Sequence, residues 1–231
     1  MKLIIKIFLS ILACCIAVVV IFNLIPKERI LLSAVNDQNV DMVDWMLKLG
    51  ADPNVHSAAY APLNLAVKNG DTAMIRKLLA HGANVNEEAN YGSGEQIPIG
   101  NLSLAINYVE NPLQVVQLLI EAGLNVADDP VALKDAIEKG NPELVKVLIK
   151  HGGDVNQGLQ FAVMYNNLAA MRLMLESGAD PNASVLLAKT TYNQEALQLL
   201  AEYGAAIKTL PREQMHPEDY KTVNGKKIRL R

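Results

Sequence analysis

The chain has 231 residues, of which 51% are hydrophobic and 19% charged, so it can form a sizeable core and is not broadly disordered. Its net charge of −3 is uneven, because residues 27–204 carry 12 basic and 21 acidic side chains whereas residues 205–231 carry 7 and 3. The acidic body argues against a nucleic-acid binder, and the position of both cysteines, Cys14 and Cys15, excludes disulfides and cysteine-based metal sites downstream.

The first 26 residues are predicted to form a signal anchor or transmembrane helix. Residues 7–25 are 19 positions whose only polar members are Ser10 and Asn23, and as a helix they can cross a hydrocarbon core of about 30 Å. Lys2, Lys6 and the free amine precede this segment. Their positive charge favours a cytoplasmic amino terminus and an exported body.

Two other kinds of export signal are alternatives to a signal anchor in this segment. Residues 11–14 resemble the lipobox of bacterial lipoproteins, in which Cys14 would be lipidated and become the new amino terminus. A cleavable signal peptide is the other alternative, although its apolar core is usually shorter. The expected location is the inner membrane, single-pass through residues 3–25 with the rest of the chain in the periplasm, or a lipoprotein lipidated at Cys14.

Six segments of the body share one pattern, an apolar helical stretch that ends at a glycine. A second helical stretch with one small residue precedes each, so every unit is predicted to be two short helices with a glycine stop. Glycine supplies the left-handed residue after a helix end, which a β-carbon would penalise by about 1 kcal/mol or more. The segments are 43–54, 75–86, 116–126, 145–156, 171–182 and 197–207, with stops at Gly50, Gly82, Gly123, Gly152, Gly178 and Gly204 and upstream alanines at Ala34, Ala66, Ala105, Ala136, Ala162 and Ala188.

The second unit carries a resemblance to the ankyrin repeat family. Residues 61–66, APLNLA, stand where that family shows Thr-Pro-Leu-His-x-Ala, and Asn69-Gly70-Asp71, Leu78-Leu79 and GANVN at 82–86 follow in order. The resemblance covers about residues 30–207, although no unit keeps the motif histidine and the glycine spacings are 32, 41, 29, 26 and 26. It implies an all-α ankyrin-repeat solenoid of about six helix pairs over residues 27–207, in which stacked neighbours bury the apolar positions.

The uneven spacing predicts fingers that are long early in the chain and nearly absent late. Residues 87–101 fill the longest gap with three glycines, Pro98 and charged side chains, which suits an exposed, extended finger. Residues 208–231 are a basic C-terminal tail. Within it, Asn224-Gly225 is either the turn of a hairpin or part of a disordered end.

The sequence offers no catalytic, cofactor-binding or metal-binding residue. His56, His81, His151 and His216 are scattered, and two of them directly precede a glycine stop, where an imidazole suits the helix carboxyl end. The pentapeptide GADPN, at 50–54 and 178–182, lacks the further carboxylates of a calcium loop and indicates a helix stop and a turn. We expect no cofactor, small-molecule substrate or nucleic acid.

Two further features have alternative interpretations. Asn101-Leu102-Ser103 and Asn182-Ala183-Ser184 match the N-glycosylation acceptor pattern, which also arises often by chance. Trp45, the single tryptophan, is expected to cap the exposed end of the first repeat, and the alternative is that it touches the bilayer interface.

The ankyrin resemblance implies a concave groove, lined by inner helices and fingers, that binds a protein partner. The third residue after each inner-helix alanine is expected to point into it, and tyrosines and a methionine near this column make a candidate hot spot. The alternative is that the tyrosines cover the edge of the stack. The candidate partner-binding residues are Lys68, Asn69, Glu88, Tyr91, Gln96, Tyr108, Lys139, Met164 and Tyr165.

These expectations define a membrane-anchored, non-catalytic protein that binds a protein partner through its groove and fingers. The alternative is an immunity protein, because small exported ankyrin proteins resemble, in size and layout, those that bacteria encode beside secreted antibacterial toxins. Such a protein would neutralise a cognate toxin, for example a lipase effector, in the periplasm.

Overall fold

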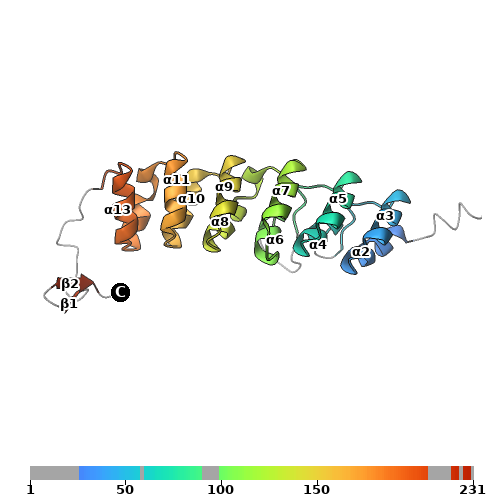
Figure 1. The fold of residues 1–231 in the computed structure, drawn as a ribbon, viewed down its shortest axis with the longest axis horizontal. Coiled ribbons are helices and arrows are strands. Elements are labelled where there is room, and N and C mark those ends of the chain that lie inside the picture. The colour runs from blue at the N-terminus through green and yellow to red at the C-terminus, as the bar shows by residue number, and fades with distance from the viewer. Residues whose placement is uncertain (1–25, 58–59, 90–98, 208–219, 224–225, 230–231) are drawn as a thin grey trace, which may run out of the picture. The chain divides into compact units, whose positions relative to one another are not determined.

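The computed structural model describes residues 26–57, 60–89, 99–207, 220–223 and 226–229 (Figure 1). Apart from Pro26, the predicted anchor lies outside these residues, and none of the helices they form is long and apolar enough to span a bilayer. The described chain forms two compact units, the first ending at Asp154 and the second beginning at Val155. The predicted domain limits after residues 26 and 207 stay predictions.

The described part of the first unit forms four helix pairs that follow one another in chain order (Figure 1). Its helices are α2 (Lys27–Asn36), α3 (Val40–Lys48), α4 (Pro62–Lys68), α5 (Thr72–Ala80), α6 (Asn101–Tyr108), α7 (Leu113–Glu121), α8 (Pro130–Glu138) and α9 (Pro142–Lys150). The even-numbered inner helices contact one another in succession, and so do the odd-numbered outer helices. A short 3-10 helix, η1 (Val126–Asp128), precedes α8.

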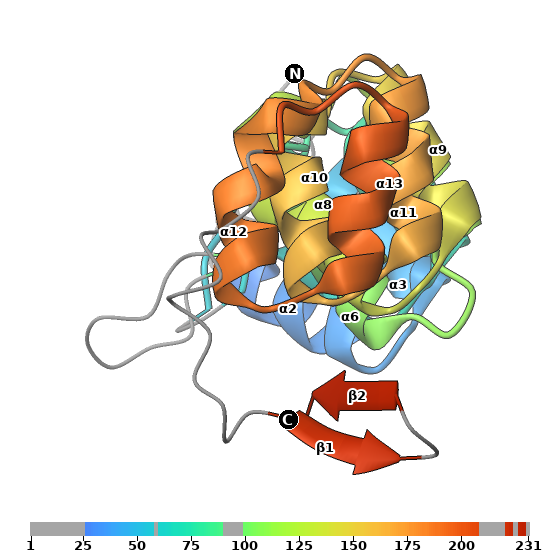
Figure 2. The same ribbon diagram turned by 90° about the vertical axis from the view of Figure 1, so that its left-hand side faces the viewer.

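The second unit contains two further helix pairs (Figure 2). They are α10 (Val155–Met164) with α11 (Leu168–Glu176), and α12 (Val185–Thr190) with α13 (Gln194–Glu202). The inner helix α12 packs on α10, the outer helix α13 packs on α11, and the 3-10 helix η2 (Pro181–Ser184) leads directly into α12. The six predicted helix pairs are therefore present among the described residues.

The tail contains the hairpin that was one of its two predicted alternatives. Strand β1 (Tyr220–Val223) pairs antiparallel with β2 (Lys226–Arg229), with Tyr220 opposite Arg229 and Val223 opposite Lys226. This register leaves residues 224–225 between the strands, and those two residues lie outside the described chain. The all-α prediction holds for the repeats, and the tail adds this two-stranded sheet.

The predicted column of small residues lies in the core. A methyl side chain lets neighbouring helices approach closely, and larger side chains such as Leu31, Leu63 and Leu102, each at most 1% exposed, fill the remaining space. All six alanines are at most 4% exposed: Ala34, Ala66, Ala105, Ala136, Ala162 and Ala188. Their burial confirms the column.

Gly82 shows how each outer helix ends. Its φ is +86°, in the left-handed region, and its N–H donates to the Leu79 carbonyl oxygen at 3.0 Å. A β-carbon at this position would have no atom within 4 Å, so backbone conformation alone selects glycine. The equivalent glycines also have positive φ, as predicted: Gly50, Gly123, Gly152, Gly178 and Gly204.

A second left-handed residue separates the inner from the outer helix in five of the six described pairs. It is a glycine in two of them, but Gln38 (φ 55°), Asn166 (φ 51°) and Tyr192 (φ 53°) in the other three. The next residue caps the outer helix, as when Asp71 accepts the Met74 N–H at 2.9 Å. The other caps of this kind are Asn39, Asn141, Asn167 and Asn193.

The asparagine of GADPN joins one repeat to the next. Asn54 Nδ2 donates to the Gly82 carbonyl oxygen at 3.1 Å, and Asn54 Oδ1 accepts the Asn84 N–H at 2.7 Å. In the second unit Asn182 Oδ1 accepts the Ala206 N–H at 2.8 Å. The predicted helix stop and turn are confirmed, and the asparagine adds a link between consecutive turns.

Both N-glycosylation triplets lie in bonded positions of the fold. Asn101 is 2% exposed, and its Nδ2 donates to the Val85 carbonyl oxygen at 2.9 Å. Asn182 holds the next turn, and Ser184 is 0% exposed. A glycan on Asn101 Nδ2, which donates to the Val85 and Glu87 carbonyl oxygens, would break a bond of the fold, so this triplet is a chance match. Asn182 is exposed and accepts through Oδ1, so its interpretation stays open.

Trp45 does not pack inward to cap the stack. It lies on α3 and is 53% exposed. The buried face of α3 is formed by Val43, Met46 and Leu47, which leaves position 45 on the solvent side. The capping expectation is wrong because helical periodicity decides which face a residue occupies, whatever its place in the array.

Exchanging residue types at the left-handed positions tests the backbone constraint. We expect Gly82→Ala to lower the free energy of unfolding by about 1 kcal/mol, because alanine is strained at positive φ. Gln38→Gly should raise it by about 0.5 kcal/mol, because relief of the same strain exceeds the added entropy of glycine in the unfolded chain. Urea unfolding followed by circular dichroism measures both, and a loss in both variants would contradict the account.

Candidate functional site

Lys68, Tyr108 and Lys139 lie on one edge of the first unit, at the carboxyl ends of α4, α6 and α8. Lys68 and Tyr108 are the last residues of their helices, and Lys139 is the residue after α8. Lys68 Nζ lies 4.9 Å from the ring centroids of both Tyr60 and Tyr108, and it donates to Tyr60 Oη at 3.2 Å. The negative faces of the two rings attract the ammonium group and hold it between them.

Lys139 extends this edge to the next inner helix. Its Nζ donates to the Asn107 carbonyl oxygen at 3.2 Å, and Asn107 Nδ2 donates to Asp135 Oδ2 at 2.5 Å. Lys134 Nζ lies 3.3 Å from the other oxygen of Asp135. We call Tyr60, Lys68, Asn107, Tyr108 and Lys139 the lysine–tyrosine strip.

The other candidate residues that the structure describes take no part in these contacts. Asn69 is exposed directly after Lys68, and Glu88 is exposed near the base of the finger. Met164 is 56% exposed and Tyr165 is half-buried, both at the end of α10 in the second unit. Tyr91 and Gln96 lie outside the described residues. That any of the nine binds a partner stays a prediction.

Buried amides hold the base of the predicted finger. Asn64, which takes the place of the motif histidine, donates to the Glu87 carbonyl oxygen at 2.9 Å and to Asn101 Oδ1 at 3.0 Å. Its own Oδ1 accepts the Ala61 N–H at 2.9 Å. Ala89 and Ile99 exchange N–H···O bonds of 2.9 and 3.1 Å and close the finger, whose residues 90–98 lie outside the described chain.

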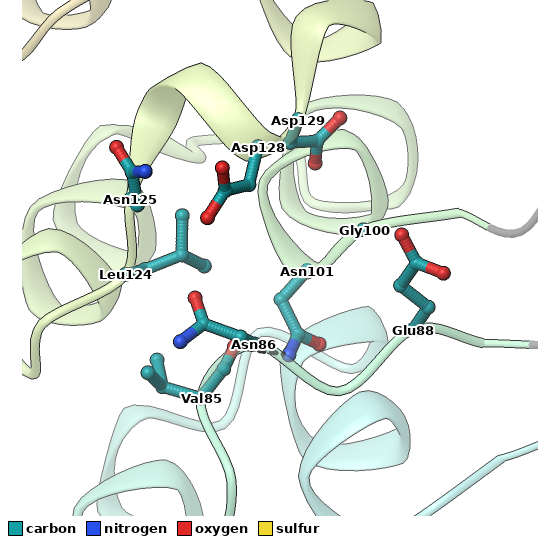
Figure 3. Close-up of a pocket in the computed structure, with 9 residues that line it drawn as sticks. All are labelled: Val85, Asn86, Glu88, Gly100, Asn101, Leu124, Asn125, Asp128 and Asp129. Carbon is teal, nitrogen blue, oxygen red and sulfur yellow. Dashed lines mark hydrogen bonds between the residues drawn. The ribbon is translucent and has the colours of Figure 1, made fainter.

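A shallow pocket of about 40 Å³ opens beside this base (Figure 3). That volume suits a few water molecules and is far below the several hundred Å³ of a typical small-molecule site. Among the described residues, no group of three or more His, Cys, Asp or Glu side chains is placed to hold a metal ion. The pocket is lined by Val85, Asn86, Glu88, Gly100, Asn101, Leu124, Asn125, Asp128 and Asp129.

Asp129 in the pocket wall is a buried structural acceptor. It accepts the Ser103 N–H at 3.1 Å, the Ser103 hydroxyl at 2.9 Å and the Ala132 N–H at 3.2 Å. Burial raises the pKa of its carboxyl group, and the bonds from Ser103 and Ala132 oppose the rise. Because these bonds cap the first turns of α6 and α8, the carboxylate fixes the spacing of two inner helices.

A second carboxylate, Asp44, links the outer helices α3 and α5. Its oxygens lie 2.6 Å from Lys48 Nζ and 2.9 Å from Lys77 Nζ. Hydrogen bonds from Lys48 and then Lys77 lower the pKa of Asp44 to about 2. Its stabilising contribution is therefore complete above the ordinary carboxyl pKa and is lost as the pH falls through about 2.

The described histidines end helices or make surface contacts. His81 and His151 are the residues that follow α5 and α9, as predicted, and His151 Nδ1 lies 2.8 Å from the Val147 carbonyl oxygen. His56 Nε2 lies 3.2 Å from Glu87 Oε1, which connects the turn of the first repeat to the finger base. His216 lies outside the described residues.

Comparison with protein families identifies the class of this fold. Residues 60–90 match the family model described as ankyrin repeat, and residues 102–185 match the one described as ankyrin repeats in three copies. Over these residues the chain consists of ankyrin repeats. Ankyrin repeats are protein–protein interaction modules, and the fold is generally a non-catalytic scaffold.

Two curated proteins are similar over part of the chain. Dynein axonemal heavy chain 12 of Bos taurus is 28% identical over 165 residues, which cover 56% of this chain and 46% of that protein. Ankyrin repeat and MYND domain-containing protein 1 of Homo sapiens is 27% identical over 115 residues, which cover 48% of this chain and 12% of that protein. The chain thus spans less than half the length of either relative.

Solved ankyrin structures share the fold. The ankyrin repeat domain of Bcl-3, a member of the IkappaB protein family, superposes with a TM-score of 0.64 at 22% identity, over 76% of this chain and 86% of that one. The ankyrin repeat protein EF0377 gives 0.60 at 22% identity, over 77% and 98%. The human ASB11 ankyrin repeat domain gives 0.57 at 20% identity, over 80% and 88%. At these identities the likeness concerns the fold alone.

A methyl group placed where the Asp129 carboxylate lies tests the structural role of this carboxylate. A β-carbon on Gly100 would lie 2.2 Å from Asp129 Oδ2, although the φ of −69° there would suit any residue. We expect Gly100→Ala to lower the free energy of unfolding by about 2 kcal/mol, because the bonded carboxylate has to move. In an Asp129→Ala background the same substitution should cost less than about 0.5 kcal/mol. Urea unfolding of the four proteins measures both costs, and equal costs would show that the carboxylate is not the obstacle.

Proposed function

We propose that this protein is a membrane-anchored, non-catalytic ankyrin repeat protein that holds a protein partner on its lysine–tyrosine strip and finger. The observation that carries the proposal is Tyr108, which is 50% exposed at the centre of the strip. The strip lysines reach it from the two neighbouring inner helices, Lys68 against its ring and Lys139 against the adjacent carbonyl group. Aromatic residues in such positions contribute strongly to binding energy at protein interfaces.

The strip also presents its side chains with little freedom. Tyr108 is anchored at the end of α6, and both lysines are held by contacts within the first unit. A tyrosine has few rotatable bonds, and lysines that are already ordered lose less entropy when a partner binds. Preorganisation of this kind supports a binding role over a purely structural one.

We further propose that residues 3–25 anchor the chain in a bacterial inner membrane, with the repeats in the periplasm. Lipidation at Cys14 is the alternative form of the anchor. The support is the long apolar sequence of this segment and the start of α2 at Lys27, directly after it. The first helix pair would then lie at the membrane surface, where the exposed Trp45 suits the bilayer interface.

An immunity protein is the narrower form of the proposal. In this form the partner is a cognate antibacterial toxin, for example a secreted lipase effector, and the strip blocks it in the periplasm. The support for this form is that small exported ankyrin proteins resemble immunity proteins in size and layout, together with the proposed export of the body.

Site-specific photo-crosslinking in cells tests the binding role of the strip. A benzophenone amino acid replaces Tyr108 in the full chain, and Lys150 on the outer helix α9 is replaced in the same way as the control. We expect a defined protein adduct from position 108 and not from position 150, because only the first position lies on the inner-helix face. Adducts of equal yield from both positions, or from position 150 alone, would contradict the proposal.

The identity of the adduct separates the two forms of the proposal. A secreted toxin as the crosslinked protein favours the immunity form. Cells that lack the protein should then die when that toxin is expressed in their periplasm, and their survival would exclude an immunity role while leaving the binding role in place.

A further inference from the structure

We infer that the partner presents an acidic, carboxylate-bearing peptide segment to the lysine–tyrosine strip, an inference that rests on the proposed binding role of that strip. The strip is an exception on a negative surface, because residues 27–154 carry 10 basic and 17 acidic side chains. Its two charged members, Lys68 and Lys139, are both cations. These two lysines differ from other lysines of the first unit in the groups that they contact.

Both strip lysines are held by neutral groups. Lys68 lies between two tyrosine rings and donates to the Tyr60 hydroxyl, and Lys139 donates to a backbone carbonyl oxygen. Neither forms an ion pair with a carboxylate among the described residues. By contrast, four other lysines of the first unit have Nζ within 3.3 Å of a carboxylate oxygen: Lys48, Lys77, Lys134 and Lys146.

The strip lysines therefore keep both charge and donors for a ligand. An ammonium group has three N–H donors, and the described hydrogen bonds use one on each lysine. The tyrosine rings fix Lys68 without neutralising it, since a cation–π contact leaves the net charge in place. A carboxylate of a partner can bind to each ammonium without first breaking an ion pair of this chain.

Two carboxylates of α8, the helix that Lys139 follows, are bonded to other groups. Asp135 is bonded to Asn107 and Lys134, and Glu138 lies 3.0 Å from Lys134 Nζ. Glu110, which is exposed two residues after Tyr108, forms no ion pair with either strip lysine among the described residues. Lys134 thus neutralises Asp135 and Glu138 within α8, whereas Glu110 stays exposed, and the two strip lysines remain without a carboxylate partner among the described residues.

Tyr108 makes the site more than a pair of charges. Its half-exposed ring lies against Lys68 and is followed along the edge by the Asn107 carbonyl group that holds Lys139. A segment that places carboxylates on the two lysines has to cross this ring. We therefore expect the segment to combine acidic residues with an apolar or aromatic one, and a nucleic acid to be repelled by the surrounding negative charge.

Fluorescence anisotropy with defined peptides tests this assignment. The full chain, purified in an uncharged detergent, is titrated into labelled peptides of equal length with alternating glutamate and serine, lysine and serine, or glycine and serine. We expect the glutamate peptide to bind most tightly and its affinity to fall as salt is raised. Lys68→Met and Lys139→Met should each weaken binding about threefold, and both together about tenfold.

Matched variants separate the strip from bulk charge. Lys150→Met removes the same charge from the outer helix α9 and should change the affinity by less than about 1.5-fold. Tyr108→Leu keeps both lysines but removes one of the two rings that hold Lys68, and should weaken binding about twofold. Equal binding of the three peptides, or equal losses from Lys68→Met and Lys150→Met, would overturn the inference. An oligonucleotide that bound more tightly than the glutamate peptide, with the same dependence on the two lysines, would also overturn the inference. A crosslinked protein that lacked an acidic segment would overturn the inference as well, but would leave the proposed binding role in place.

Discussion

The structure depends on the close approach of inner helices at buried alanines. A single helix pair has more apolar surface than it can bury, so neighbouring pairs must lie near one another, and the methyl groups of Ala66, Ala105 and Ala136 permit this. The same column sets the register of the helix ends. Lys68, Tyr108 and Lys139 each follow one of these alanines by two or three residues, and this is why they meet on one edge.

Polar links then fix what apolar packing alone would leave free to slide. Asn54 ties its own turn to the next, and the pair formed by Asn64 and Asn101 closes the finger base. Asp129 bonds to the first turn of α6 and caps α8, and so joins two inner helices at their amino ends. These bonds are directional, whereas apolar contact is not. They fix the spacing of the inner helices whose carboxyl ends carry the strip.

Most of the fold is predictable from the sequence because its causes are local. A left-handed glycine, a small residue in an inner helix and an apolar stripe each act within a few positions, and Gly82 and Ala66 occupy the predicted environments. The Asn and Asp caps of the outer helices are local as well. They are recognised only when the structure shows a left-handed residue, such as Gln38, directly before the cap. Trp45 was misplaced because its face depends on helix phase.

The candidate site was predictable in position but not in chemistry. Counting three residues from an alanine reaches Tyr108 and Lys139, and the structure brings both to one edge. The rings around Lys68 and the carbonyl group under Lys139 join residues far apart in sequence, across loops of unequal length. No periodic pattern encodes such contacts. They hold Lys68 and Lys139 in place, and on them depends the proposal that this edge is a binding surface.

Amide hydrogen exchange on the complex with the crosslinked partner tests the central claim most directly, namely that the inner-helix edge of the first unit is the binding surface. The account predicts that added protection on binding is concentrated at the carboxyl ends of α4, α6 and α8, around Lys68, Tyr108 and Lys139. Protection confined to the outer helices α5, α7 and α9, with the strip unchanged, would contradict it.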